Sequence, residues 1–224
     1  MRLCMFHPND NPMDRGWVGR VDGDRVLHLA AQTLQSLFLG GGSAREHGEY
    51  ARADVTLLVP VQVPPTVRVF DAEDDFAFAN ATAIGGPGLE VASNGGILLL
   101  VPRLAAVIGA EGAIAGFSLF AEWRRDGGTP PKDRDFALVL GPVVATPDEL
   151  DPSATTIVVR ADGSDVARID PSAFDWTAAV ALAAQGTTLR PGDVLAGPGD
   201  PISGLTGGVE LEADGIGVLV QSIA

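Results

Sequence analysis

The sequence is poor in cysteine, aromatic residues and positive charge. Cys4 is the only cysteine, so no disulfide can form within the chain. Lys and Arg number 15 against 29 Asp and Glu, which gives a formal net charge of -14. Such an acidic surface repels phosphate backbones and anionic lipids, so we expect neither a nucleic-acid partner nor a membrane-surface partner.

No long apolar run is present either. The most apolar stretch, residues 96–116, is broken by Pro102, Arg103, Glu111 and several glycines, so a membrane-spanning helix of roughly 20 residues is not expected there. The first residues, MRLCMFHPNDNPMDRGW, contain neither an apolar run nor a small-residue cleavage site typical of a secretory signal. We therefore expect a soluble cytoplasmic protein.

The composition that is present favours a folded chain with many turns. Hydrophobic residues make up 46% of the 224 residues, and there are 28 Gly and 16 Pro. This length supports one sizeable core, or a small domain joined to a larger one. The pair Pro64-Pro65 closes the apolar run Val55–Val63, which predicts a domain boundary there, with a small N-terminal domain over residues 1–63 and a larger domain over residues 64–224.

Local signals indicate more strands than helices. Residues 16–30 predict two short strands around a turn at Asp22-Gly23-Asp24, and residues 31–38 predict a short helix. A second helix is expected over residues 176–185, with Asp175 as its N-cap. Further strands are expected over residues 96–108, 113–120, 136–144 and 155–160, and a hairpin over residues 209–223. The predicted class is α+β and rich in β-structure.

Five segments in order resemble the fumarylacetoacetate hydrolase family. The most specific is KDRDFALVLGPVVATPDEL, residues 132–150, which is similar to the lysine-containing strand and turn of that family. The others are VPPTVRVFDAEDDF (63–76), FAFANATAIGGPGLEV (76–91), RLAAVIGAEGAIAGFSLF (103–120) and TTLRPGDVLAGPGDP (187–201). The resemblance implies a mixed β-sandwich or β-roll domain preceded by a small α/β N-terminal unit.

The resemblance also implies a chemistry. Enzymes of the family act on small acids with 1,3-dicarbonyl or 2-oxo groups, by C–C hydrolysis, decarboxylation, hydration or tautomerisation. A divalent metal, usually Mg²⁺, holds the oxygens of the substrate, and a His moves a proton. Family members commonly form dimers, so a homodimer is expected.

This sequence departs from the family pattern where the metal should bind. The Glu-x-Glu of the family corresponds here to Val101 and Arg103, and no Asp or Glu occurs in residues 97–110. Glu122 corresponds to a further acidic ligand, so one carboxylate is retained. Because Val and Arg do not ligate Mg²⁺, the sequence predicts no metal and no cofactor, although Mg²⁺ is expected for the family.

Two further replacements concern the region where substrate would bind. Val69 corresponds to the Asp of the Arg-Asp-Phe triplet of the family, and Phe76 to its His. Together with Val101, these side chains would give a drier pocket for a larger and less polar ligand. We therefore count Val69, Phe76 and Val101 as candidate substrate-binding residues.

The candidate catalytic residues are Glu122 as acid or base, with Arg103 and Lys132 as electrostatic stabilisers. We hypothesise that Arg103 pairs with Glu122, because an unpaired guanidinium inside an apolar strand costs several kcal/mol. The alternative is that Pro102 turns Arg103 to solvent, and Lys132 has the parallel alternative of an ordinary surface lysine. Arg124 and Arg125 are candidates to bind an anionic substrate, or are solvated turn residues.

Three functions follow from these observations. The first is a metal-independent enzyme that performs proton transfer, tautomerisation, cyclisation or lyase chemistry on a small oxo acid or polyketide-like substrate. The second is a non-catalytic relative that binds a small acid or forms a heterodimer with an active partner. The third is a conventional Mg²⁺-dependent hydrolase with relocated ligands among Asp71, Glu73, Asp74 and Asp75, a cluster that otherwise forms a solvated loop.

Overall fold

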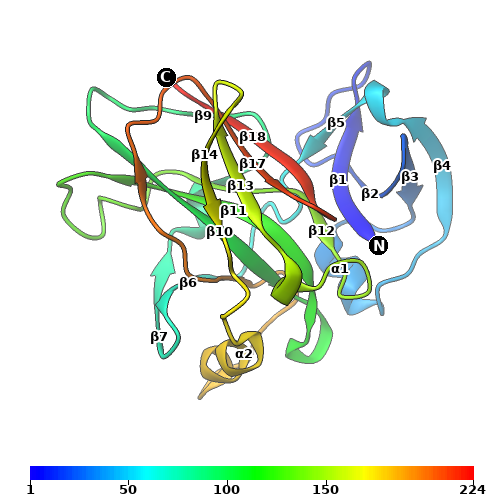
Figure 1. Cartoon of the computed structure of the whole chain (residues 1–224). Helices are drawn as coiled ribbons and strands as arrows, with labels where there is room; N and C mark the ends of the chain where they lie inside the picture. Colours follow the sequence, from blue (N-terminus) through cyan, green and yellow to red (C-terminus); the bar gives the residue numbers. More distant parts are fainter.

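The computed structural model describes all residues, 1–224, as two β-sheets with two short α-helices (Figure 1). The larger sheet has 13 strands in the order β4-β3-β2-β1-β12-β11-β10-β15-β6-β7, with β5, β8 and β16 attached beside it. These strands are β1 (Arg2–Pro8), β2 (Trp17–Asp22), β3 (Arg25–Leu29), β4 (Glu46–Ala51), β5 (Val55–Leu58), β6 (Val67–Ala72), β7 (Asp75–Ala79), β8 (Ile84–Gly85), β10 (Leu98–Ile108), β11 (Ile114–Arg125), β12 (Leu138–Ala145), β15 (Val194–Ala196) and β16 (Ile202–Ser203).

The smaller sheet has five strands in the order β14-β13-β17-β18-β9. They are β9 (Leu89–Val91), β13 (Ile157–Ala161), β14 (Ser164–Ile169), β17 (Gly208–Ala213) and β18 (Gly217–Ile223). The predicted β-rich α+β class is confirmed, and the C-terminal hairpin forms around Asp214-Gly215 as its turn chemistry predicts.

The N-terminal strands form where the sequence predicts them. β2 and β3 pair so that Asp22 lies opposite Arg25, with Gly23 in the left-handed conformation at φ 56° in the turn. The helix α1 spans Leu34–Leu39, a little later than predicted, because Thr33 is its N-cap and forms a capping box with Ser36. β1 pairs with β12, so the larger sheet continues across residue 63, and the two-domain division stays a prediction.

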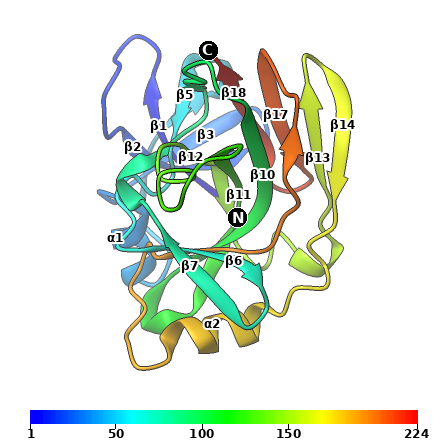
Figure 2. The same ribbon diagram turned by 90° about the vertical axis from the view of Figure 1, so that its left-hand side faces the viewer.

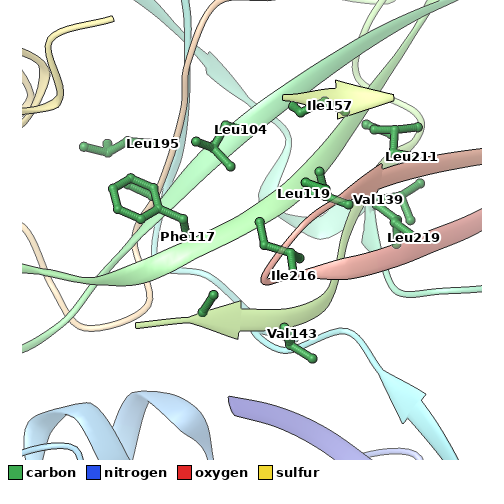
Figure 3. Packing of buried hydrophobic residues seen from close by; sticks show 14 of the residues in the cluster. Leu104, Phe117, Leu119, Val139, Val143, Ile157, Leu195, Leu211, Ile216 and Leu219 are labelled. Carbon is green, nitrogen blue, oxygen red and sulfur yellow. The ribbon is translucent and has the colours of Figure 1, made fainter. Parts of the chain in front are cut away.

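The long hairpin β10–β11 forms the centre of the molecule, and both of its faces are covered. One face packs on the smaller sheet, where Leu104 and Leu119 lie among Leu211 and Leu219 (Figure 3). The other face packs with the N-terminal strands in a second buried cluster that includes Val107. A strand buried on both faces carries a nearly continuous apolar sequence, which explains the run in residues 96–108. Arg103 on β10 and Glu122 on β11 are the fully buried charged residues of the hairpin.

The helix α2 spans Trp176–Ala184 and lies below β6 and β7 (Figure 2). Asp175 is its N-cap and accepts hydrogen bonds from the amides of Thr177 and Ala178, as predicted. Trp176 packs edge-on against Phe117 with ring centres 5.1 Å apart, which fixes α2 to the β10–β11 hairpin. Neither helix is long and apolar enough to cross a membrane.

Candidate functional site

The side chain of Arg103 on β10 is fully buried, and all five of its N–H donors have an acceptor. Nε donates to Glu122 Oε2 at 3.0 Å, and Nη2 donates to the same oxygen at 2.8 Å. Nη2 also donates to Asp71 Oδ1 at 2.6 Å. Nη1 donates to the carbonyls of Phe70 at 2.9 Å and Gly197 at 2.8 Å. The hypothesised pairing of Arg103 with Glu122 is therefore present in the structure, and the solvent-facing alternative is not.

Glu122 on β11 is equally buried and accepts hydrogen bonds from three arginines. Besides Arg103, Arg124 donates to Oε1 and Oε2 at 3.0 Å each, and Arg134 Nε donates to Oε1 at 2.7 Å. Burial by itself would raise the pKa of Glu122, but the hydrogen bond from Arg124 and the charges of Arg103 and Arg134 outweigh it, so the pKa lies below its ordinary value. Glu122 is ionised and its acceptor sites are occupied.

Asp71, which follows Phe70 on β6, completes the group. It accepts from Arg124 Nη2 at 3.0 Å and from Arg134 Nη2 at 3.2 Å, in addition to Arg103. Burial opposes ionisation, but the hydrogen bond and charge of Arg103 lower the pKa of Asp71 to about 2. We call these five residues the arginine cluster: Asp71, Arg103, Glu122, Arg124 and Arg134. Three positive and two negative charges give the cluster a formal charge of +1.

Strand periodicity explains why the cluster forms. In β10 and β11, Val101 lies opposite Glu122, so Arg103 and Glu122 project from the same face of the hairpin as diagonal neighbours. Pro102 is tolerated because β15 pairs with residues 105–107 of β10 and β16 with residues 99–100, which leaves this edge unpaired at Pro102.

The loop after β15 closes over this gap. A Cβ atom on Gly199 would lie 2.2 Å from the carbonyl oxygen of Pro102 and 3.2 Å from Cγ of Arg103. Only glycine allows the backbone to approach this closely. The approach brings the Gly197 carbonyl to Arg103, so the Gly-rich loop contributes a backbone acceptor to the cluster.

The structure brings only some of the predicted site residues together. Arg103, Glu122 and Arg124 lie in the cluster. Lys132 does not, because its side chain is 83% exposed and pairs with Asp135 at 2.7 Å. Arg125 projects from the other face of β11, where it donates to the Ser93 carbonyl at 2.9 Å and stacks on Phe136 at 4.2 Å.

The predicted apolar lining is placed differently from the expectation. Val69 and Val101 are 1% and 0% exposed and belong to the packed interior. Phe76 on β7 is half-buried and contacts the rings of Phe70 and Phe78 at 5.4 and 5.6 Å. Val69 and Val101 therefore have almost no accessible surface with which to contact a ligand. Ligand contact by any of the three residues stays a prediction.

Sequence reasoning missed Arg134 and undervalued Asp71. Arg134 lies in the loop between β11 and β12, where no periodicity indicates which way a side chain points. The position of Asp71 could have been predicted, because it follows Val69 by two residues and strand alternation puts the two on one face of β6. Glu73, Asp74 and Asp75 are exposed in the β6–β7 turn region, and no group of three or more His, Cys, Asp and Glu side chains lies together here.

The family model described as fumarylacetoacetate (FAA) hydrolase C-terminal matches residues 103–224, which is more than half of the chain and includes four of the five cluster residues. The chain belongs to the fumarylacetoacetate hydrolase family. No curated protein was found to match the chain in sequence.

Solved structures of this family's fold align over the whole chain. Maleylpyruvate hydrolase from Sphingobium sp. SYK-6, in complex with manganese (II) ion and pyruvate, is 20% identical with a TM-score of 0.81, covering 100% of this chain and 99% of that chain. 5-Carboxymethyl-2-hydroxymuconate delta-isomerase from Mycobacterium smegmatis is 22% identical with a TM-score of 0.81, over 100% and 99%. 2-Keto-3-deoxy-D-arabinonate dehydratase, complexed with magnesium and 2,5-dioxopentanoate, is 16% identical with a TM-score of 0.79, over 100% and 98%. At these identities the likeness establishes the fold, and these neighbours are enzymes.

The prediction that no cofactor belongs here is wrong as it was made. Two of these neighbours were solved in complex with manganese or magnesium and an oxo acid, so this fold accommodates a divalent ion. Oxygens of Asp71, Glu122, Phe70 and Gly197 converge on one point. In this chain the guanidinium of Arg103 lies at that point. With Arg103 in place, a divalent ion does not fit among these oxygens, so no chemical step is derived through one.

Proposed function

We propose that this member of the fumarylacetoacetate hydrolase family binds a small oxo acid at the arginine cluster and promotes proton transfer at the carbon next to the oxo group. The observation that carries the proposal is the accessible edge of the cluster. Arg103 is 0% exposed, whereas the side chains of Arg124 and Arg134 are 21% and 18% exposed. The guanidinium groups of Arg124 and Arg134 therefore reach solvent, next to Arg103, whose N–H donors all have acceptors within the protein.

The charge distribution supports an anionic ligand. The whole chain carries a formal charge of -14, yet the cluster has a surplus of one positive charge. An anion would therefore be attracted to this place on an otherwise repulsive surface. Arg is suited to the role, because its planar fork donates two parallel hydrogen bonds to one carboxylate. Neighbours of the same fold hold pyruvate or 2,5-dioxopentanoate, and both molecules carry an oxo group and a carboxylate.

The proposed chemistry depends on negative charge that develops on the oxo acid during the reaction. Removal of a proton from the carbon next to the oxo group moves negative charge onto the oxo oxygen, giving an enolate. A guanidinium held in place by carboxylates stabilises that charge without having to reorient during the reaction. Tautomerisation, cyclisation and lyase reactions of oxo acids share this step, and they differ in what the enolate does next.

The residue assigned as acid or base requires a different role. Glu122 is ionised and its oxygens accept from three guanidinium groups, so we propose that it positions Arg103, Arg124 and Arg134 and does not exchange protons. Asp71 reaches solvent, with its side chain 51% exposed, but a pKa of about 2 makes it a weak base. Asp71 is nevertheless a stronger base than water, so the proton is expected to pass to Asp71 and from there to solvent.

The low pKa values of both carboxylates favour one alternative, a non-catalytic protein that binds a small acid or pairs with an active family member. Neither Asp71 nor Glu122, whose pKa values are lowered, is suited to accept and release a proton near pH 7. Binding without turnover would then be the function of the site, and the arginines would bind the ligand carboxylate in the same way.

Hydrogen–deuterium exchange at the methyl group of pyruvate separates the two functions. We expect the wild-type protein to accelerate loss of the methyl proton signal in D₂O above the buffer rate. Arg124→Gln and Arg134→Gln are each expected to lower that acceleration at least tenfold, about 1.4 kcal/mol of lost stabilisation or more. Lys132→Ala is expected to leave it unchanged.

The same exchange is measured with EDTA and with added Mg²⁺ or Mn²⁺. Pyruvate binding with exchange only at the buffer rate would favour the non-catalytic alternative. Exchange that appears only with an added ion would assign enolate stabilisation to that ion and overturn the role given to the arginines. Absence of both binding and exchange would overturn the proposed ligand class.

A further inference from the structure

His28 and His47 lie side by side on neighbouring strands, away from the strands that form the arginine cluster. His28 is on β3 and His47 is on β4. The pairing places His28 opposite Gly48 and Leu29 opposite Glu46, so a bulge at this point leaves His47 as the extra residue. The two imidazole rings are 5.4 Å apart between centres, with an interplanar angle of 32°.

The surroundings of His28 leave room for this arrangement. Its partner on the other side, in β2, is Gly19, so a glycine lies opposite His28 on both neighbouring strands. Trp17 stacks on the His28 ring with centres 4.7 Å apart and an interplanar angle of 11°. One imidazole is therefore half-buried and held by packing, and the second is exposed and free to adjust to a ligand. A pair with one member fixed binds at a smaller entropic cost than two mobile side chains.

Both histidines line one cavity of about 600 Å³, over β3, β4 and α1. Its polar lining also includes Gln32, Ser36 and Ser43, and no charged side chain takes part. The imidazole nitrogens are thus the strongest donors of electron pairs in the cavity. Neither a carboxylate nor an ammonium group lines it to compete with a ligand or repel one.

We propose that His28 and His47 form a two-imidazole site for a transition-metal ion such as Zn²⁺. Imidazole suits Zn²⁺, Cu²⁺ and Ni²⁺, whereas Mg²⁺ prefers oxygen ligands. A tetrahedral ion with Zn–N bonds of about 2.0–2.1 Å in line with each ring sets the ring centres roughly 5.2 Å apart. The observed 5.4 Å matches this spacing.

Two protein ligands leave two positions of a tetrahedral ion for water or for an oxygen or nitrogen donor from outside. The hydroxyl of Ser43 lies in the same cavity and can hydrogen-bond to such ligands, whereas that of Ser36 is engaged in the capping box of α1. An ion bound here would therefore keep coordination positions that exchangeable ligands can occupy. The two histidines lie on other strands than the arginine cluster. A test of the metal site is therefore independent of the proposed oxo-acid function.

Zinc titration of the tag-free, chelator-treated chain by calorimetry tests the site. We expect binding of about one equivalent of Zn²⁺. His47→Ala is expected to weaken the affinity at least tenfold, and so is His28→Gln, which keeps a planar side chain against Trp17. The chain has three histidines, and His7→Ala is the matched control that removes an imidazole elsewhere. Circular dichroism confirms that each variant is folded.

The nitrogen resonances of the three imidazoles identify the ligands directly. We expect Zn²⁺ to shift those of His28 and His47 and to leave those of His7 in place, while Mg²⁺ shifts none of them. Absence of Zn²⁺ binding would overturn the site and reduce the pair to an aromatic contact. Zinc affinity that survives His47→Ala would place the ion elsewhere and overturn the site equally.

Discussion

Two arginines are buried, Arg103 on β10 and Arg68 on β6, and the protein compensates their charges in different ways. Arg103 has five hydrogen bonds to two carboxylates and two backbone carbonyls. Arg68, which is 4% exposed, donates to the Thr66 hydroxyl and lies 3.9 Å from Asp193. Its Nε has no acceptor, and its guanidinium lies over the rings of Phe76 and Phe78, at 5.6 and 5.2 Å from their centres.

The difference lies in what surrounds each guanidinium. Aromatic rings and a distant carboxylate accommodate Arg68 as part of the packing of the β6–β7 hairpin. Arg103 is enclosed by oxygens, and the carboxylates that hold it also hold Arg124 and Arg134 at an accessible edge. Arg68 is a packing residue of the hairpin, whereas Arg103 anchors the polar surface that we propose as the anion-binding site.

Arg103→Met should have the largest effect on stability. The variant removes the central cation from Glu122, Asp71 and two carbonyls, leaving a buried carboxylate with fewer partners. Loss of one member of a buried ion pair costs about 3–5 kcal/mol, and we expect at least the lower figure in urea-induced unfolding at pH 7. Arg125→Met is the matched control on the neighbouring strand β11. A loss below about 1 kcal/mol for Arg103→Met would show that the arginine cluster does not stabilise the fold.

Arg68→Met should cost less, about 1–2 kcal/mol. Methionine keeps contact with the two phenylalanine rings, and Asp193 retains its hydrogen bonds from Thr66 and the Arg190 amide. The same unfolding measurement compares the two variants. A cost equal to or above that of Arg103→Met would contradict the distinction between the two arginines.

Asp71→Asn should change how stability depends on acid. The pKa of Asp71 is lowered from 3.8 to about 2, so its contribution is fully present above the unfolded pKa and is lost as the pH falls through the folded value. Wild-type stability should therefore fall more steeply than that of the variant between about pH 4 and pH 2. Urea unfolding over this range measures the slopes, and parallel slopes would show that Asp71 is not ion-paired in solution.

Lys132→Ala should have the smallest effect, within about 0.5 kcal/mol, because Lys132 is exposed and an exposed ion pair contributes little. Thermal unfolding measures the change. A loss of stability as large as that expected for Arg68→Met would contradict the exposed position of Lys132.

Sequence reasoning predicted what depends on neighbours along the chain. The turn between Asp22 and Arg25, the N-cap at Asp175 and the hairpin at Asp214-Gly215 are local, and each formed as predicted. The pairing of Arg103 with Glu122 could also be predicted, because one hairpin makes the two residues diagonal neighbours on the same face.

Contacts between segments far apart in the sequence could not be predicted in this way. Arg134 enters the cluster from a loop, and the Gly197 carbonyl enters from a segment 94 residues beyond Arg103. Neither approach leaves a periodic pattern in the sequence. The error about the cofactor has a different cause: ligands were counted in this chain alone, whereas structures of the same fold hold manganese or magnesium.

Calorimetric titration with pyruvate tests the central claim, that the accessible arginines of the cluster bind an oxo acid. The three proteins to compare are the wild type, the double variant Arg124→Gln/Arg134→Gln, and Arg125→Gln, whose side chain projects from the other face of β11. We predict that the double variant binds at least tenfold more weakly, about 1.4 kcal/mol or more, while Arg125→Gln binds as the wild type does. Equal affinity in all three proteins, or weakening in Arg125→Gln alone, would contradict the account.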